Sequence, residues 1–264
     1  MSLLSVVRDV AAVVGVRAPT SVIAQIGSNR TMFEMLACAN EMAQRIAYDT
    51  RDWTALRKVH TFVGTDLNPD PDPKKVTAQA AFDLPADFQR MLLTSEIWRS
   101  TSTQQPMLFI SDHNEWLKRR NANESDGYGE WTTFGGQIHV HPPLPPLVPA
   151  IPDDPGPPFV PGTAEIPAVT AEFLYLSKNC VKLASGGVGD RFIDDADSFR
   201  LDERLLKLGM TWQWKAQKGS PYAEDLGTYQ DAIANAMGRE KPAPIILYRP
   251  RRWGGGAWDA VFRQ

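Results

Sequence analysis

Cysteine is scarce in this chain, which has Cys38 and Cys180 among its 264 residues. Two thiols so far apart in the sequence do not establish a disulfide, because bridging requires two closely spaced Cα atoms. We expect both to be small buried side chains of a protein that folds in a reducing cytoplasm.

Long apolar runs are also missing. No segment approaches the ~20 apolar residues that a membrane-spanning helix needs. The first ten residues are largely apolar, but Arg8 and Asp9 interrupt them, so they lack the pattern of a signal peptide. The net charge of −3 gives no general attraction to nucleic acid or to membranes. We therefore expect no membrane partner.

Sequence signatures of catalysis and of metal binding are absent as well. The chain has no Gly-x-Ser-x-Gly or His-Glu-x-x-His motif, and its Cys and His spacings do not resemble a zinc site. The glycine-rich segment 186–190 lacks the Lys-Ser/Thr pair of a phosphate-binding loop. His139 and His141 share one face of a predicted strand, but no third ligand lies nearby in the sequence. We expect a protein that is not an enzyme and has neither cofactor nor metal.

Proline, in contrast, is abundant, and eleven of the 21 prolines lie between residues 142 and 167. Proline removes backbone donors and favours extended polyproline geometry. We predict a long surface loop over residues 142–167, between strands at 137–141 and 171–176 that pair with each other. Loops of this length are usually functional or disordered.

Helices are predicted near both ends of the chain. Ser2 can cap a helix over residues 2–14, and Gly15 is placed to end it. Thr31 and Glu34 fit a capping box at the start of a second helix. Its expected apolar stripe is Met32, Leu36, Ala39, Ala43 and Ile46. A short helix at 51–56 is expected to bury Trp53.

Two further helices are predicted after residue 200. The first ends at Gly219, and the second begins with Ser220 as N-cap and Pro221 at the first helical position, and closes at Gly238. The buried stripe expected for the first is Leu201, Leu205, Leu208, Trp212 and Ala216. The stripe expected for the second is Tyr222, Leu226, Tyr229, Ile233 and Met237.

The segment between these helices has the composition of a β-rich domain. Strands are predicted at 59–63, 76–82, 96–99, 106–110, 137–141 and 171–176. A helix is predicted at 112–120, with Asp112 as N-cap and Glu115 as its capping-box partner. We expect an α+β fold, with a helical bundle core from both chain ends, an inserted antiparallel β-rich domain and an extended C-terminal arm. The corresponding segments are 1–58 and 181–240 for the helical core, 59–180 for the inserted domain and 241–264 for the arm.

The arm, residues 241–264, shows no helical stripe but is rich in large apolar and basic side chains. From residue 239 onward it has six Lys or Arg and two acids, a charge of +4. Aromatic and arginine side chains are the types that anchor interfaces, and a free tail would expose them. The arm could pack on its own domain, bind nucleic acid by stacking, or dock onto another subunit, and we favour docking. The predicted docking residues are Tyr248, Arg249, Arg251, Arg252, Trp253, Trp258 and Phe262.

Four segments, taken in order, carry a resemblance that spans most of the chain. They are Met-Ser-Leu-Leu-Ser-Val-Val-Arg-Asp-Val at 1–10, Asn40 to Trp53 with its Arg-Asp-Trp-Thr-Ala-Leu ending, Leu-Pro-Ala-Asp-Phe at 84–88, and residues 201–229, which contain Leu-x-x-Gly-x-x-Trp and Lys-Gly-x-x-Tyr-Ala-Glu-Asp. In this order they resemble the head-to-tail adaptor proteins of tailed bacteriophages, especially short-tailed ones. The proline-rich loop departs from that family's pattern.

The resemblance implies a structural virion protein, made in the host bacterial cytoplasm, that assembles as a dodecameric homo-oligomeric ring beneath the capsid portal. The arm would reach along the portal protein, the opposite face would receive tail nozzle or tail tube proteins, and the lumen would pass double-stranded DNA without reading its sequence. An alternative is a tail nozzle or gatekeeper component. From other classes, the β-rich segment could be a carbohydrate-binding or hydrolytic module, or His139 and His141 could belong to a metal enzyme.

Overall fold

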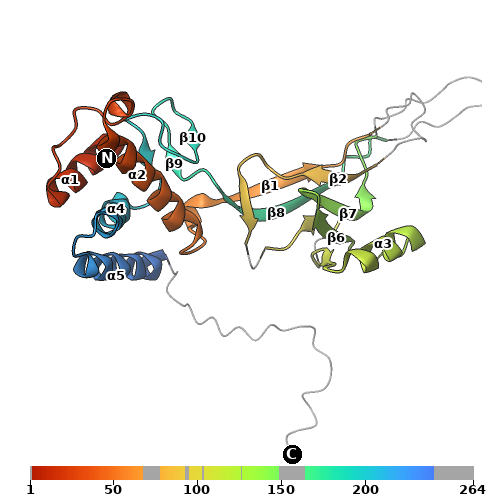
Figure 1. Cartoon of the computed structure of the whole chain (residues 1–264). Helices are drawn as coiled ribbons and strands as arrows, with labels where there is room; N and C mark the ends of the chain where they lie inside the picture. Colours follow the sequence, from red (N-terminus) through yellow and green to blue (C-terminus); the bar gives the residue numbers. More distant parts are fainter. Residues whose placement is uncertain are drawn as a thin grey trace, which may run out of the picture.

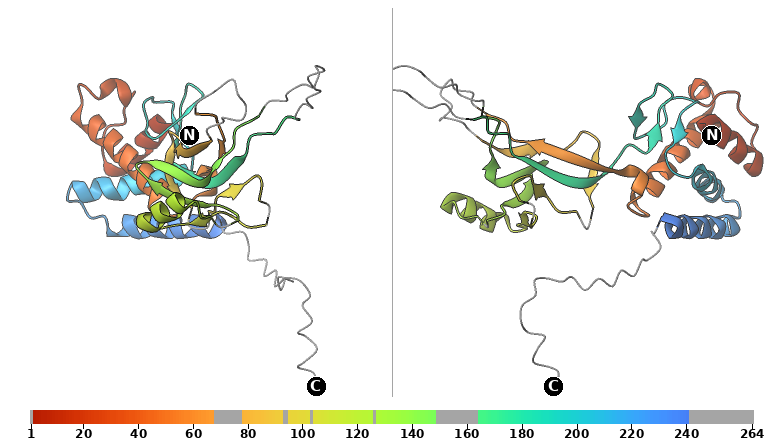
Figure 2. Two further views of the ribbon diagram at one scale, coloured as in Figure 1. Left: turned by 90° about the vertical axis from the view of Figure 1, so that its right-hand side faces the viewer. Right: turned by 180° about the vertical axis from the view of Figure 1, so that it is seen from behind.

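The computed structural model describes residues 2–67, 78–92, 95–102, 104–125, 127–148 and 164–240. The protein is elongated, with most helices gathered at one end and most strands at the other (Figure 1). Strands β1 (Arg57–Val63) and β8 (Thr170–Ser177) run side by side from one end toward the other, as both views in Figure 2 also show. The predicted α+β class is confirmed.

The helical end contains four α-helices packed around one core. They are α1 (Leu3–Val14), α2 (Arg30–Tyr48), α4 (Glu203–Gln217) and α5 (Ala223–Glu240), with short 3₁₀ turns at Ile23–Gln25 and Thr54–Leu56. Helix α4 packs against α1, α2 and α5. Val7, Met35, Ile46 and Met210 are completely buried there, so this core joins segments from both ends of the chain.

The ends of the helices follow local capping chemistry, with one correction. Ser2 caps α1 and Gly15 closes it with a φ of 75°, both as predicted. For α2 the predicted capping box is wrong, because Asn29 is the N-cap and its side chain accepts a hydrogen bond from the Thr31 amide at 3.0 Å. With Asn29 in an extended conformation the helix starts before Thr31, and the Glu34 carboxylate is left to pair with neighbouring cations.

The buried surface of α4 differs from the predicted stripe. Leu205 is buried, but Leu201, Leu208, Trp212 and Ala216 are only partly buried. Other α4 side chains are buried instead: Leu206, Met210, Thr211, Gln213 and Trp214. The reason is tertiary, since α1 and α2 cover one side of α4 and α5 covers another.

Helix α5 also departs from its predicted boundaries. It begins at Ala223 rather than beside Ser220, and it continues past Gly238 to Glu240. Tyr229 is buried as predicted, whereas Tyr222 precedes the helix and is exposed. The last turn is held beyond the glycine by the segment after α2, because Arg51 donates to the Met237 carbonyl and Thr54 donates to the Glu240 carboxylate.

Within the described ranges, the strands form two main sheets and a small one. In the first, β8 pairs in antiparallel fashion with β1, β3 (Phe88–Met91) and β4 (Trp98–Arg99). The second has the order β2 (Gln79–Asp83), β7 (Gln137–Leu144), β6 (Glu130–Phe134) and β5 (Leu108–Phe109), with β5 parallel to β6. The third, near the helical end, contains β9 (Val181–Lys182), β10 (Val188–Gly189) and β11 (Ser198–Phe199). Helix α3 (His113–Ala122) lies at the far end of the molecule.

The predicted pairing of strand 137–141 with strand 171–176 is wrong. These segments lie in β7 and β8, which belong to different sheets. Their inward side chains, such as Ile138 and Phe173, meet in a second core between the sheets, so the strands face each other instead of sharing hydrogen bonds. The segments that follow β7 and precede β8 approach each other at the base of the proline-rich loop. There Val148 and Ile166 exchange two backbone hydrogen bonds of 2.9 and 3.0 Å, and the Val169 amide donates to the Pro145 carbonyl at 2.9 Å.

Three side chains predicted to be buried, Trp53, Cys38 and Cys180, are buried in the structure. Trp53 is buried as expected, and its indole donates to the Ile46 carbonyl at 2.7 Å, but the helix around it shrinks to a 3₁₀ turn. Cys38 and Cys180 are both free and buried, as expected. Burial raises the pKa of the Cys38 thiol to about 12 and that of the Cys180 thiol to about 11.

Across the ranges that the structure covers, no helix has the length and apolar character needed to cross a membrane.

Candidate functional site

The docking residues predicted from the sequence lie outside the described residues. They are Tyr248, Arg249, Arg251, Arg252, Trp253, Trp258 and Phe262. The candidate site within the described part of the chain is a groove at the helical end that the sequence did not reveal.

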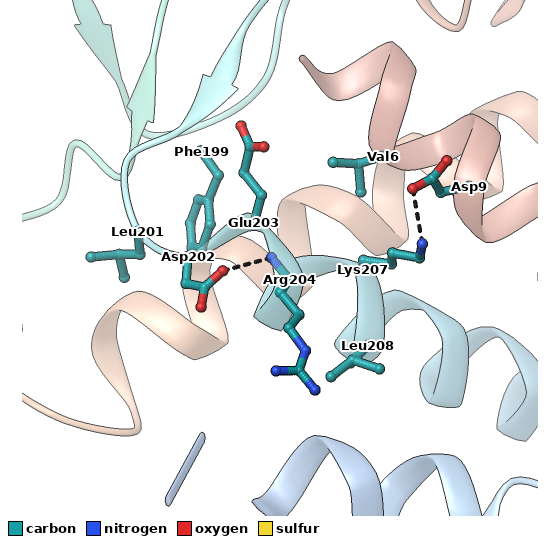
Figure 3. Close-up of a pocket in the computed structure, with 9 residues that line it drawn as sticks. All are labelled: Val6, Asp9, Phe199, Leu201, Asp202, Glu203, Arg204, Lys207 and Leu208. Atoms are coloured by element: carbon teal, nitrogen blue, oxygen red, sulfur yellow. Dashed lines mark hydrogen bonds and ion pairs between the residues drawn. The ribbon is translucent and has the colours of Figure 1, made fainter. Parts of the chain in front are cut away.

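The groove lies between α1 and the first turns of α4 and has a volume of about 750 Å³ (Figure 3). Val6 and Phe199 are buried beneath it, and the partly exposed Leu201 and Leu208 add to its apolar surface. The complete lining is Val6, Asp9, Phe199, Leu201, Asp202, Glu203, Arg204, Lys207 and Leu208. It is therefore a mainly apolar hollow with charged side chains around it, a composition typical of interface cores and their rims.

Helix capping fixes one wall of the groove. The Asp202 carboxylate accepts a hydrogen bond from the Arg204 amide at 2.9 Å and so sets where α4 begins. This places the first turn of α4 directly after Phe199 and Leu201. A cap of this kind contributes about 1 kcal/mol to stability.

Backbone contacts fix the other wall. The amides of Leu3 and Leu4 donate to the carbonyls of Asp197 and Asp195 at 2.7 and 3.1 Å, which ties the start of α1 to the segment before β11. The Asp197 carboxylate is completely buried and accepts from the amides of Ala184, Ile193 and Asp194, each at 2.8 Å. The groove thus has a rigid frame.

Asp195 strengthens the same frame. Its carboxylate accepts from the amides of Val22 and Ile23 at 2.9 and 3.0 Å, and from the Ser21 hydroxyl. Burial alone would raise its pKa, but these hydrogen bonds and the Arg8 charge hold the pKa of Asp195 below its ordinary value. The acidic residues at 194–197 therefore serve the local fold.

An ion pair crosses the groove. Lys207 Nζ on α4 lies 2.8 Å from Asp9 Oδ2 on α1, as the dashed line in Figure 3 shows. Both side chains are partly exposed, so the pair contributes at most about 1 kcal/mol. Its main effect is to set the spacing of the two helices at this point.

A second hollow of about 280 Å³ extends the groove along α5. It shares Asp202 and Arg204 with the first and continues beside Asp231 to Arg239, one residue before the end of α5. That end is held in place, because Glu240 accepts hydrogen bonds from the Thr54 amide and hydroxyl at 3.2 and 3.0 Å. The chain therefore leaves the helical end beside this path.

A second apolar surface lies on the outer face of the first sheet. Val59 on β1 is directly opposite Leu174 on β8, and their side chains are 59% and 43% exposed. Trp98 on β4, 41% exposed, pairs with Glu172 on the same face, and Val63 lies further along β1. Soluble monomers rarely leave large apolar side chains grouped in this way. We call this set of four, Val59, Val63, Trp98 and Leu174, the outer sheet face.

The two histidines considered as metal ligands are instead in contact with aromatic rings. The His139 ring stacks on Phe134 with centroids 3.6 Å apart, and the His141 ring meets Trp116 edge-on at 6.2 Å. Burial lowers the pKa of His139. In the part of the chain that the structure describes, no group of three or more His, Cys, Asp or Glu side chains could hold a metal ion.

Helix α3 covers these rings and shows one further correction. Asp112 is its N-cap, as predicted, and accepts from the Asn114 amide at 2.8 Å. Glu115 does not complete a capping box, because Arg119 one turn later lies 2.7 Å from its carboxylate. Arg119 also lies 2.6 Å from the buried Glu130 carboxylate on β6. Arg119 therefore pairs with Glu115 on its own helix and links α3 to β6.

Comparison with known proteins adds no family assignment. No protein-family model matches the chain, and no curated protein is significantly similar to it.

Proposed function

We propose that this protein is a structural virion component that forms a ring, joins the capsid portal to the tail and extends the genome channel. In this proposal it acts by assembly and not by catalysis. The helical core is built from residues 1–58 and 181–240, residues 59–180 form an inserted domain, and the arm at 241–264 docks onto the portal protein. The order of the four sequence segments supports the family, and the surfaces of the structure support an assembly role.

The outer sheet face is the observation that carries the proposal. A contact between this face and a different surface of the next copy is heterologous, and repeated contacts of this kind close into a ring when the rotation permits. In a closed ring each copy is held by contacts on two sides, so a pairwise contact of modest free energy is enough to stabilise the ring. The virion location, the dodecameric number and the passage of DNA through the lumen follow from the family resemblance.

Mutation of the outer sheet face tests the ring contact. Leu174→Lys places a charge on this face, directly opposite Val59, but leaves the buried side of β8 unchanged, so the monomer should fold while ring formation on portal rings is lost. Leu117→Lys is the matched control, because Leu117 is an equally exposed leucine on α3. Mass photometry with and without portal rings measures the assembly. Rings of normal mass formed by Leu174→Lys would contradict the proposed contact.

Deletion of residues 241–264 tests the docking arm. We expect the shortened chain to remain a folded monomer and to lose co-sedimentation with portal rings, because its aromatic and arginine anchors are gone. A chain with the arm replaced by a Gly/Ser segment of equal length controls for size. Co-sedimentation of the shortened chain would show that the arm does not dock.

A further inference from the structure

We infer that, before assembly, the groove between α1 and α4 holds the protein's own C-terminal segment through the apolar run Ile245, Ile246, Leu247 and Tyr248. This inference deepens the proposed function, on which it rests for the partner that releases the segment. The groove then keeps the docking arm covered until a portal ring competes for it.

The second hollow reaches the end of α5, after which residues 241–264 follow in the sequence. The second hollow is lined by the first turn of α4 and by the last three turns of α5, up to Arg239. It continues into the main groove through Asp202 and Arg204, which line both. One continuous surface therefore leads from the exit of the chain to the apolar surface over Val6 and Phe199.

The spacing of the segment suits this path. Four residues, Lys-Pro-Ala-Pro at 241–244, separate Glu240 from Ile245. Four extended residues span up to ~14 Å, and an α-helix with its side chains is about 10 Å across. The residues that precede the two prolines favour extended backbone. Ile245 can therefore pass from the end of α5 to the first turn of α4.

The chemistry of the segment is complementary to that of the groove. Three aliphatic side chains and one tyrosine would cover the surface formed by Phe199, Leu201 and Leu208. The two hollows together carry four carboxylates and three basic side chains, a formal charge of −1. Residues 241–264 carry five basic side chains and one acid, a formal charge of +4. The two charges attract each other.

The chain's own segment has an advantage over a segment from another copy. A short linker holds it at an effective concentration in the millimolar range, on the order of a thousandfold above a micromolar protein solution. At that concentration the segment occupies the groove of its own chain even if the contact is weak. A portal ring that offers pockets for more of the arm's side chains can then displace the segment.

Photo-crosslinking in the full chain tests the inference. A photoreactive p-benzoylphenylalanine replaces Leu208 at the groove wall, and equal amounts of ordinary and ¹⁵N-labelled protein are mixed before illumination. We expect cross-linked peptides that join position 208 to residues 245–248, with both partners carrying the same isotope. Mixed-isotope pairs would show that another copy fills the groove, and cross-links confined to residues outside 241–264 would show that the segment does not bind there. Either result overturns the inference.

Control variants show whether the cross-links depend on the groove. The same photoreactive group at Leu117 on α3 should give no cross-link to residues 241–264. If the Leu208 position impairs folding, as circular dichroism would show, the group is placed at Leu201 on the same wall. Leu208→Asp combined with the probe at Leu201 should lower the yield of the same-isotope product at least about tenfold, because a carboxylate faces the apolar run. An unchanged yield would also overturn the inference.

Adding portal rings separates this inference from the proposed function. Loss of the same-isotope product on ring binding is expected if the portal takes over the arm. If the product forms in the free chain and persists when rings are bound, the groove contact stands and the docking role of the arm is wrong.

Discussion

Replacing Asp87 by asparagine removes a carboxylate that contacts β1 and β8 from the turn before β3. Asp87 lies in the turn before β3, within the Leu-Pro-Ala-Asp-Phe segment at 84–88. Its Oδ2 atom is 2.5 Å from Lys58 Nζ on β1 and accepts from the Ser177 hydroxyl at 2.7 Å, and its Oδ1 atom accepts from the Tyr175 hydroxyl at 2.8 Å. Asparagine keeps the shape but loses the charge.

The size of the effect follows from the pKa of Asp87. Burial alone would raise that pKa, but the hydrogen bonds from Lys58, Ser177 and Tyr175 outweigh it and lower the pKa to about 2. An unfolded aspartate titrates near 3.9, and each pKa unit corresponds to about 1.4 kcal/mol, so the ionised group stabilises the fold by roughly 2–3 kcal/mol. The side chain is 18% exposed, so solvent weakens these contacts little. We expect Asp87→Asn to lose about 2 kcal/mol at pH 7.

The effect should depend on pH in a defined direction. Because the folded pKa is lower than the unfolded one, the stabilisation is complete above about pH 4 and is lost as the pH falls toward 2. Wild type and variant should therefore converge in acid.

Urea unfolding at pH 7, 5, 4 and 3, followed by circular dichroism and tryptophan fluorescence, measures both effects. Asp83→Asn is the control, because that carboxylate is exposed and accepts from the Gln137 amide at 2.8 Å. The control should change stability by less than about 0.5 kcal/mol, as surface substitutions usually do. A deficit for Asp87→Asn below that value at pH 7, or one that is the same at pH 7 and pH 3, would refute the reasoning.

Three further predictions concern other parts of the molecule. Gly64→Ala should lower the free energy of unfolding by about 1–3 kcal/mol, because a Cβ atom would overlap the backbone carbonyls of Leu144 and Pro145; an unchanged urea midpoint would contradict this. Joining Val148 to Ile166 by an Asn-Gly turn should leave the melting temperature nearly unchanged, since these residues already form a bridge and long surface loops cost little; a large drop would show that the excised loop is structural. Both thiols should resist alkylation at pH 8 until the protein unfolds, because burial raises the pKa of each; rapid labelling of the native protein would count against that burial.

Predictions succeeded where a structure depends on neighbours in the sequence. Ser2 and Gly15 delimit α1 because capping involves residues within one turn. The same holds for Asp112 at the start of α3. The sequence misplaces the start of α2 because Asn29 and Thr31 are both competent caps, and in the structure Asn29 has the extended conformation and the side-chain hydrogen bond of the N-cap.

Predictions failed where distant segments choose their partners. The periodicity of β7 and β8 indicates strands but contains no information about which strand lies alongside, so their pairing was predicted wrongly. The spacing that predicts a buried Leu208 fails for a similar reason. Its heptad-like spacing is real, but the packing of three helices around α4 leaves it at the wall of a groove.

The sequence by itself determined the α+β composition, the helices near both ends, the buried Trp53 and thiols, and the candidate arm residues at 248–262, which lie outside the described residues. The tertiary structure alone decided the sheet partners, the outer sheet face and the groove. The ion pair between Asp9 and Lys207 shows why, since it joins residues 198 positions apart. Local patterns specify how a segment folds, but a surface shared by both ends of the chain exists only after long-range packing has brought them together.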